Sequence, residues 1–426
     1  MLQILSVRKI LHVISASMLL ACAYMQVAFP QNNPFPTSTP IGFDITVTNN
    51  TQKNASQTRT LTPTRTPTST SSRTPSSTPT RTSTSTTTPS PTITPTGIPT
   101  HTPTLLPTPS NSLRAYAYQR GIRIGSLFLA EPSYSDPFYI TTFLHEFDTA
   151  TINRFQFNHI RSRNGKYNFS RIDPLIDLMQ ANGITVIGHS LVYHMNVPRW
   201  LEEGSWTSEQ AKETLHEYIT KVVSRYRHRV TVWTVVNEAV GDDGLLRDTF
   251  WLRMIGPDYI PLAFQWAHEA DPDAILIYND YHLERSEIKS RAVLVLMEQL
   301  LAQGVPVHGV GFQMHLEIGS APPRQQVQLM MNKFAKLGLS SYITEMDIQL
   351  KEPATHDKLA QQARIYADMA DACLNAAKCR AFVMWGFTDA YSWIPKKYTG
   401  YGTALILDAY YQPKPAYYSL LDTLSH

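Results

Sequence analysis

Two glutamates directly follow short β-branched segments of the chain. Glu238 ends the segment WTVVNE, and Glu345 ends the segment YITE. If both segments are strands of one barrel, the two carboxyl groups share a mouth, where one can donate a proton while the other attacks or activates water. Hydrolysis of a glycosidic bond needs such a pair. For a single strand-end glutamate, the alternative is a surface charge or a salt bridge.

Other segments of this kind also end in polar or aromatic residues. The endings are GHSLVYH at 188–194, NDY at 279–281, QMH at 313–315 and WG at 385–386. So many similar endings favour one shared functional mouth over unrelated surface charges. Trp and Tyr supply flat apolar faces for sugar rings, although a single Trp is more often a core residue.

These endings belong to a regular alternation of short apolar segments with longer segments of helical period. We expect strands at 122–128, 149–152, 185–190, 231–237, 274–279, 308–313, 341–345 and 381–386. We expect helices at 140–147, 172–181, 209–226, 260–270, 288–303, 325–337, 356–374 and 413–424. Thr207 and Gln210 predict a capping box at the start of the third helix.

The alternation predicts an α/β fold whose parallel sheet is covered on both faces. A (β/α)8 TIM barrel and an open doubly wound sheet both satisfy this pattern. Eight repeats favour the barrel, and its active site would lie at the carboxyl ends of the strands.

The first residues of this 426-residue chain have the layout of an export signal. Within residues 1–30, Arg8 and Lys9 precede a short apolar stretch. Three outcomes are open: cleavage after Ala23, a lipid on Cys22 in a bacterial lipobox, or an uncleaved anchor, since the apolar character continues to Phe29. All three predict an exported protein, secreted or attached to the cell surface, and the last two predict membrane attachment through the N-terminus.

Residues 31–111 are rich in Thr, Ser and Pro and hold few large apolar side chains. Such a composition cannot offset the entropy of ordering, and its prolines favour extended chain. We therefore expect a disordered linker, or stalk, before a globular catalytic domain at 112–426.

The formal net charge of +3 does not describe the globular domain. The export segment carries two of the positive charges and the linker a net four more, which leaves −3 for residues 112–426. A mildly acidic domain gives no electrostatic reason to expect a nucleic-acid partner. The sequence also lacks zinc-ligand, phosphate-loop and nucleophile-elbow motifs, so we predict no metal and no cofactor.

Seven stretches, in order, resemble glycoside hydrolase family 10, the endo-β-1,4-xylanases and their relatives. They are GHSLVYH (188–194), WTVVNEA (233–239), DPDAILIYNDYHLE (271–284), VHGVGFQMHL (307–316), ITEMDI (343–348), WGFTDAYSW (385–393) and YQPKPAYY (411–418). Together they are highly specific, and the resemblance extends across essentially all of residues 113–426. The resemblance implies an endo-acting enzyme that hydrolyses the β-1,4 linkages of xylan, and we expect it to be a monomer.

The resemblance also implies roles for individual residues. Glu345 would be the nucleophile and Glu238 the acid/base of a double displacement with retention of configuration. Substrate binding is implied for eight residues: Asn153, His189, Asn237, Tyr281, Gln313, His315, Trp385 and Trp393. For the two histidines, a satisfied core histidine is the alternative.

The second strand departs from the family pattern. The family typically has Glu-Asn followed by Met-Lys-Trp, whereas this chain has INRFQF at 152–157, so that only Asn153 remains. The lost Glu and Lys usually hold the glycone sugars, and Tyr193 also replaces a usual Trp. The alternatives to plain xylan are therefore another β-glycan or a decorated xylan, or a barrel that only binds glycan at the surface.

Cys373 and Cys379 are the only cysteines outside the export segment. The family often has a cysteine pair just before strand eight, so the resemblance and the expected export imply a disulfide. In one unbroken helix the two residues would be about 9 Å apart along the axis, beyond the roughly 7 Å between Cα atoms that a bridge allows. The seventh helix must therefore end between Leu374 and Lys378.

Overall fold

The computed structural model describes residues 111–426 of the protein. The predicted export segment at 1–30, with Cys22, and the predicted linker up to residue 110 lie outside the described residues. Within residues 111–426, none of the helices has the length and apolar character needed to cross a membrane.

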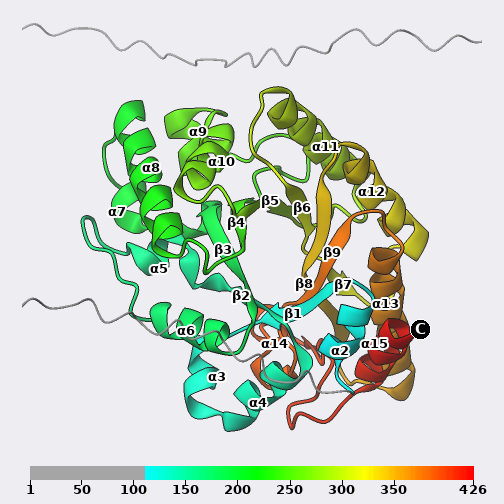
Figure 1. Ribbon diagram of the computed structural model, residues 1–426. Helices are drawn as coiled ribbons and strands as arrows, with labels where there is room; N and C mark the ends of the chain where they lie inside the picture. Colours follow the sequence, from blue (N-terminus) through cyan, green and yellow to red (C-terminus); the bar gives the residue numbers. More distant parts are fainter. Residues whose placement is uncertain (1–110) are drawn as a thin grey trace, which may run out of the picture. The chain divides into compact units, whose positions relative to one another are not determined.

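Eight parallel strands close into a barrel with helices around it (Figure 1). Hydrogen bonds join neighbours in the order β1, β2, β3, β4, β5, β6, β8 and β9, and β9 pairs with β1 to complete the ring. The strands are β1 (Arg123–Leu127), β2 (Thr149–Ile152), β3 (Thr185–Tyr193), β4 (Val232–Asn237), β5 (Ile275–Asp280), β6 (Gly309–Phe312), β8 (Ser340–Lys351) and β9 (Cys379–Met384). The predicted (β/α)8 barrel is confirmed, and the open doubly wound sheet is excluded.

All eight expected helices are present within three residues of the predicted bounds. They are α4 (Pro137–Glu146), α6 (Asp173–Ala181), α8 (Ser208–Arg225), α10 (Tyr259–Ala270), α11 (Glu287–Ala302), α12 (Arg324–Lys336), α13 (His356–Leu374) and α15 (Pro415–Ser425). The capping box is confirmed: Gln210 N–H donates to Thr207 Oγ1 at 3.2 Å, and Thr207 N–H donates to Gln210 Oε1 at 3.0 Å.

Shorter α-helices and 3-10 helices lie between or beside these main elements. They are α2 (Leu113–Gln119), α3 (Ala130–Ser135), η1 (Asn153–Phe155), α5 (Phe157–Ile160), η2 (His194–Asn196), α7 (Arg199–Glu202), α9 (Phe250–Ile255), η3 (Asp389–Tyr391) and α14 (Ile394–Lys397). The prediction was wrong about the end of β8, which continues six residues past Glu345. The added length pairs with two short strands that the sequence did not indicate, β7 (His315–Glu317) and β10 (Tyr401–Gly402).

Apolar side chains fill the barrel and separate it from the helices. A small interior cluster comes from several strands: Ile187, Val232, Ile277, Tyr342, Ala381 and Val383. A larger cluster lies between the strands and the surrounding helices. Gly188 on β3 packs directly against the Trp233 ring, and a Cβ at this position would lie 2.4 Å from that ring. The position is thus closed to any larger residue just before His189.

A disulfide joins Cys373, in the last turn of α13, to Cys379, the first residue of β9. Helix α13 ends at Leu374, which lets the chain turn and brings the two Cα atoms to 5.3 Å. The disulfide therefore links the end of α13 covalently to the start of β9.

Candidate active site

The two glutamates lie at the same mouth of the barrel: Glu238 past the end of β4, and Glu345 within β8, two residues past the segment 340–343 that pairs with β6. Glu238 directly follows β4, and its backbone is in the left-handed region at a φ of 56°. Non-glycine residues adopt this conformation rarely, and it persists only where the surroundings hold it. Here the Glu238 N–H donates to the carbonyl of Asn279 at 2.9 Å, which ties the turn to β5.

A buried amide network links the two carboxyl groups. Asn279, on β5, donates from Nδ2 to Asn237 Oδ1 at 2.8 Å and to Glu345 Oε1 at 2.7 Å. Gln313 donates from Nε2 to Glu238 Oε1 at 2.9 Å and lies 3.4 Å from Asn237 Oδ1. The hydroxyl of Thr344 donates to Asn279 Oδ1 at 2.7 Å, so the amide orientation of Asn279 is determined. The predicted residues Asn237, Gln313, Glu238 and Glu345 are thus brought together.

Gly311 on β6 makes room for this network. A Cβ at this position would lie 2.1 Å from Asn279 Oδ1 and 2.8 Å from Thr344 Cγ2. Contacts that short require a shift of the amide, and only glycine avoids them. The placement of Asn279 between the glutamates therefore depends on a residue two strands away from Glu238.

Glu238 is held by one of its two oxygens. Gln313 Nε2, Tyr193 OH and Asn237 Nδ2 approach its Oε1 at 2.9, 3.2 and 3.4 Å. Burial raises the pKa of the Glu238 carboxyl, and the negative charges of Asp280 and Glu345 raise it further against the opposing bond from Gln313. A carboxyl group in this environment keeps its proton to a higher pH than usual.

Glu345 has the opposite environment. Burial alone would raise the pKa of its carboxyl, but His189, His315 and Asn279 outweigh burial and lower the pKa. His189 Nδ1 lies 4.0 Å from Glu345 Oε1, and His315 Nε2 lies 3.3 Å from Oε2. Glu345 is therefore ionised under conditions where Glu238 keeps its proton.

His315 carries the positive charge beside Glu345. Although burial opposes it, Asp347 and Glu345 raise the pKa of His315 to about 10. Protonated His315 donates from Nδ1 to Asp347 Oδ1 at 3.0 Å and from Nε2 to Glu345. Trp393 donates from Nε1 to Asp347 Oδ2 at 2.7 Å, so one carboxylate fixes both a histidine and an indole.

The other predicted binding residues surround the pair. The ring of Trp385 lies 5.3 Å from that of His189, and the ring of Trp393 lies 5.1 Å from that of His315. Tyr281, after β5, accepts a bond from Arg247 Nη2 at 2.9 Å, and its ring lies 3.1 Å from Lys289 Nζ. Asn153 begins η1 at the end of β2 and is half-buried.

Strand two presents no acidic or basic group in place of the family's Glu and Lys. Ile152 is fully buried within the larger apolar cluster. Gln156 is nearly buried, and its Oε1 accepts a bond from Asn196 Nδ2 at 2.7 Å. Arg154 lies between them in sequence, but it forms an ion pair with Glu131. The glycone side of the mouth is therefore poorer in charged groups.

Sequence reasoning did not single out Asn279, Asp347 and Tyr193 as site residues. A usable signal existed for Asn279, which lies near the end of β5 in the polar pattern seen elsewhere at this mouth. Asp347 lies on the part of β8 past Glu345, which the sequence did not indicate. Tyr193 was noted only as a replacement for Trp, and its bond to Glu238 required the structure.

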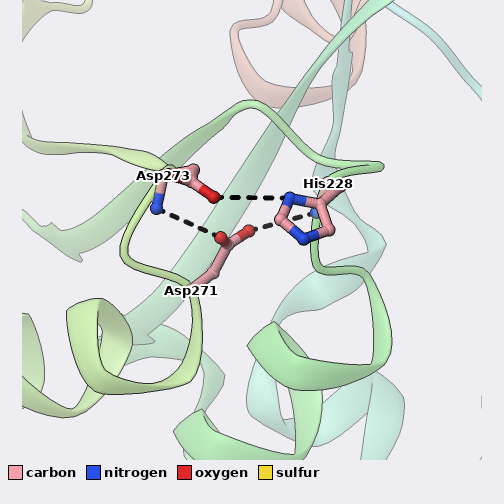
Figure 2. A group of neighbouring side chains, drawn as sticks. All are labelled: His228, Asp271 and Asp273. Atoms are coloured by element: carbon pink, nitrogen blue, oxygen red, sulfur yellow. Dashed lines mark hydrogen bonds and ion pairs between the residues drawn. The ribbon is translucent and has the colours of Figure 1, made fainter.

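One group of potential metal ligands lies at the other end of the barrel, before β4 and β5 (Figure 2). The ligand atoms of His228, Asp271 and Asp273 lie within 4.8 Å of one another. Asp271 already accepts bonds from the backbone N–H groups of His228 at 3.2 Å and Asp273 at 3.3 Å, and Arg227 Nε lies 3.7 Å away. These contacts stabilise two turns, so we assign the group a structural role.

Comparison with known proteins agrees with this geometry. A family model described as glycosyl hydrolase family 10 matches residues 112–423. The chain is 40% identical over 288 residues to endo-1,4-beta-xylanase B of Thermotoga neapolitana. The match covers 67% of this chain and 83% of that protein.

Solved structures give the same result. Xylanase 10B from Thermotoga petrophila RKU-1 in complex with xylobiose aligns with a TM-score of 0.72 and 41% identity, over 74% of this chain and 97% of that chain. Endo-1,4-beta-xylanase XylE of Penicillium canescens aligns with a TM-score of 0.72 and 30% identity, over 74% of this chain and 97% of that chain. Since the family model spans nearly all of the described barrel, the chain belongs to glycosyl hydrolase family 10.

Proposed function

We propose that the protein is an endo-acting β-1,4-xylanase that works by double displacement with retention of configuration. Similar proteins carry the name endo-1,4-beta-xylanase, and the solved Thermotoga petrophila relative holds xylobiose. The observation that carries the mechanism is the opposite perturbation of two glutamates within one hydrogen-bond network. Different environments for two carboxyl groups indicate an acid and a nucleophile.

In the first step, Glu238 protonates the leaving oxygen while the Glu345 carboxylate attacks the anomeric carbon. The three donors at Glu238 Oε1 leave Oε2 free to face the substrate. Asn279 and His315 hold the nucleophile by one oxygen each. The glycosidic bond breaks, and a covalent glycosyl ester forms on Glu345.

In the second step, Glu238 acts as a base and takes a proton from the water that hydrolyses the ester. Esterification removes the negative charge of Glu345, which in the free enzyme raises the pKa of Glu238. Glu238 therefore gives up its proton more readily at the stage that requires a base. Release of the sugar returns both carboxyl groups to their starting states.

The surrounding residues suit substrate binding. Asn237 would bond the 2-hydroxyl of the sugar at the cleavage site, with His189, Gln313 and His315 around the same ring. Trp385 and Trp393 would form the aromatic wall at the cleavage site. Asn153 would bind on the glycone side, and Tyr281 would contact the acceptor side.

Product stereochemistry and two variants test the proposal. NMR of products from xylo-oligosaccharides should show β-configured ends first. Glu345→Gln should reduce turnover by several orders of magnitude, while Glu238→Ala should spare aryl xylobiosides whose leaving groups need no acid. Initial α-configured products, or equal losses on all substrates in both variants, would contradict the assignment. Failure of the wild type to release sugar from any β-glycan would leave only the glycan-binding alternative.

A second candidate substrate is another β-1,4-glycan or a decorated xylan. The observation that favours it is strand two, where Ile152 is buried and Gln156 is engaged with Asn196. Each charged hydrogen bond lost there is worth about 1.5 to 3 kcal/mol. Comparison of kcat/KM on linear xylan, glucuronoxylan, arabinoxylan and mixed-linkage glucan decides between them, because a marked preference for a substrate other than linear xylan would overturn the plain-xylan assignment.

We also propose that the protein is exported and acts as a monomer outside the cell, with residues 31–111 as a stalk. The layout of residues 1–30 supports this proposal. Mass spectrometry of the mature N-terminus separates cleavage after Ala23 from a lipid on Cys22 or an intact anchor. A Cys22→Ser variant should move to the medium only in the lipoprotein case. Retention of full-length protein in the cytoplasm would refute export.

A further inference from the structure

Exposed aromatic residues occur on neighbouring segments at one part of the barrel. Tyr134 in α3, Phe138 at the start of α4 and Tyr410 before α15 are 65%, 69% and 83% exposed. Tyr411 is half-buried, and its ring lies 6.3 Å from that of Phe138. We call these four residues the aromatic rim. Isolated exposed rings are ordinary, but several together on neighbouring segments mark a binding surface.

The rim lies on the same side of the barrel as the candidate active site. Helices α3 and α4 follow the carboxyl end of β1, and the segment around Tyr410 belongs to the connection that leaves the carboxyl end of β9. Figure 1 shows the cyan helices α3 and α4 beside the red segment that leads into α15. Because β1 pairs with both β2 and β9, the rim borders the glycone side.

The chain segment from Trp385 to Phe387 connects the rim with the cleavage site. His189 contacts Trp385 at 5.3 Å, and two residues later Phe387 lies 6.4 Å from Tyr411. Tyr411 in turn contacts Phe138. The connection from Trp385 to Tyr411 therefore carries both the wall of the active site and part of the rim.

Asp136 fixes Tyr411 of the rim and the start of α4. One of its carboxylate oxygens accepts bonds from Tyr391 OH at 2.9 Å and from Tyr411 OH. Its other oxygen accepts the backbone N–H groups of Phe138 at 3.0 Å and Tyr139 at 3.3 Å at the start of α4. The same side chain thus caps α4 and holds Tyr411, so the ring of Tyr411 binds without a large loss of side-chain entropy.

The composition of the rim suits a sugar chain. Its exposed large side chains are aromatic, and exposed Ser135 and Gln412 next to them offer neutral hydrogen-bonding groups. The exposed aliphatic and thioether side chains, Met195, Leu245, Ile288 and Leu329, lie on other segments. Flat rings with neutral polar neighbours match the alternating C–H faces and hydroxyl edges of a β-1,4-glycan.

We propose that the aromatic rim is a second glycan-binding surface, which holds the glycone end of the polysaccharide beyond the cleavage site. The inference rests on the proposed function, since the ligand is the same β-1,4-xylan chain. It also accounts for a barrel that has lost charged groups on strand two. Binding energy missing near the cleavage site is supplied farther along the polymer.

Binding of the full-length chain to insoluble xylan tests the rim. In a Glu345→Gln background, which prevents digestion, Phe138→Ala with Tyr410→Ala should weaken binding at least fivefold, because each exposed ring contributes a stacking contact. The matched control is Tyr118→Ala, since Tyr118 lies in α2, before β1, and is 78% exposed. The control should stay within twofold of its parent.

Kinetics provide the second measurement, with Glu345 intact. The ratio of kcat/KM on polymeric xylan to kcat/KM on an aryl xylobioside should fall at least fivefold in the double variant and stay constant in the control. An unchanged ratio together with unchanged binding would refute the rim while leaving the proposed function standing. Self-association of the wild type that the double variant abolishes, with xylan binding unchanged, would assign the rim to a second copy of the chain and also refute the proposal. If the wild type cleaves neither substrate, the proposed function is refuted. The proposal for the rim would then hold only if binding to an insoluble β-1,4-glycan depends on Phe138 and Tyr410.

Discussion

Asp347→Asn isolates the charge that keeps the nucleophile ionised. Asp347 is fully buried and accepts bonds from His315 Nδ1 at 3.0 Å and Trp393 Nε1 at 2.7 Å. Asparagine has nearly the same shape and can still accept from Trp393 while donating to a neutral His315. The substitution therefore removes a charge and preserves most of the packing.

The expected magnitude follows from the contacts. Hydrogen bonds to charged groups are worth about 1.5 to 3 kcal/mol, against about 0.5 to 1.5 kcal/mol for neutral ones. His315 donates to Glu345 at 3.3 Å, and its positive charge lowers the pKa of Glu345. Without Asp347, His315 loses the main support for its proton, so the pKa of Glu345 rises. A difference of about 1.4 kcal/mol corresponds to tenfold, or about one pH unit.

The assay is the pH dependence of kcat/KM on an aryl xylobioside with a good leaving group, so that the acid limb reports the ionisation of Glu345. The acid limb should move to higher pH by about one unit in Asp347→Asn. Asp389→Asn is the control, because Asp389 forms a 2.7 Å ion pair with Lys414 and touches neither glutamate. An acid limb that stays in place in Asp347→Asn would show that His315 is neutral or uncoupled from Glu345.

Three further predictions follow from the same geometry. Gly311→Ala should lower kcat at least tenfold, because the added Cβ displaces Asn279. Gly309→Ala is the control: its Cβ would lie 2.6 Å from Ser340 O, so it should lower the free energy of unfolding by a similar amount but leave kcat per folded molecule unchanged. Equal kcat values in the two variants would contradict the role of Asn279. Tyr193→Phe removes a hydrogen-bond donor to ionised Glu238, so the pKa of Glu238 should rise. The alkaline limb of the pH profile of kcat/KM should therefore move to higher pH, and a shift to lower pH would refute the role of Tyr193. Cys373→Ala with Cys379→Ala should lower the free energy of unfolding by about 2 kcal/mol on the chain-entropy model, measured in denaturant, and the denatured, unreduced wild-type domain should show no reactive thiol.

Periodicity was enough to predict the barrel because each repeat carries its own signal. The helix at 356–374 was predicted at its observed bounds, and the capping box formed from Thr207 and Gln210 as the local pattern indicated. Such features depend on contacts within one segment. The extension of β8 to Lys351 depends instead on β7 and β10, whose pairing is tertiary, so no pattern within 341–345 could reveal it.

The candidate site was predictable in its outline for a similar reason. A parallel barrel places every carboxyl strand end at one mouth, so Glu238 and Glu345 could be expected to meet. The sequence could not indicate that Ile152 would be buried in the core or that Gln156 would pair with Asn196. Both outcomes depend on side-chain packing between β2 and its neighbours.

The different roles proposed for the two glutamates, acid/base and nucleophile, also depend on side-chain packing. Both are buried glutamates at the same mouth of the barrel, and burial alone would raise the pKa of each. They differ because His189, the cationic His315 and Asn279 face Glu345, whereas Glu238 faces Asp280 and Glu345 itself. Of the two glutamate carboxyl groups, the side chain of Asn279 bonds only that of Glu345 directly. Exchange of the two roles would therefore require moving the histidines, Asp347 and Asp280 together, and no single substitution at either glutamate can achieve it.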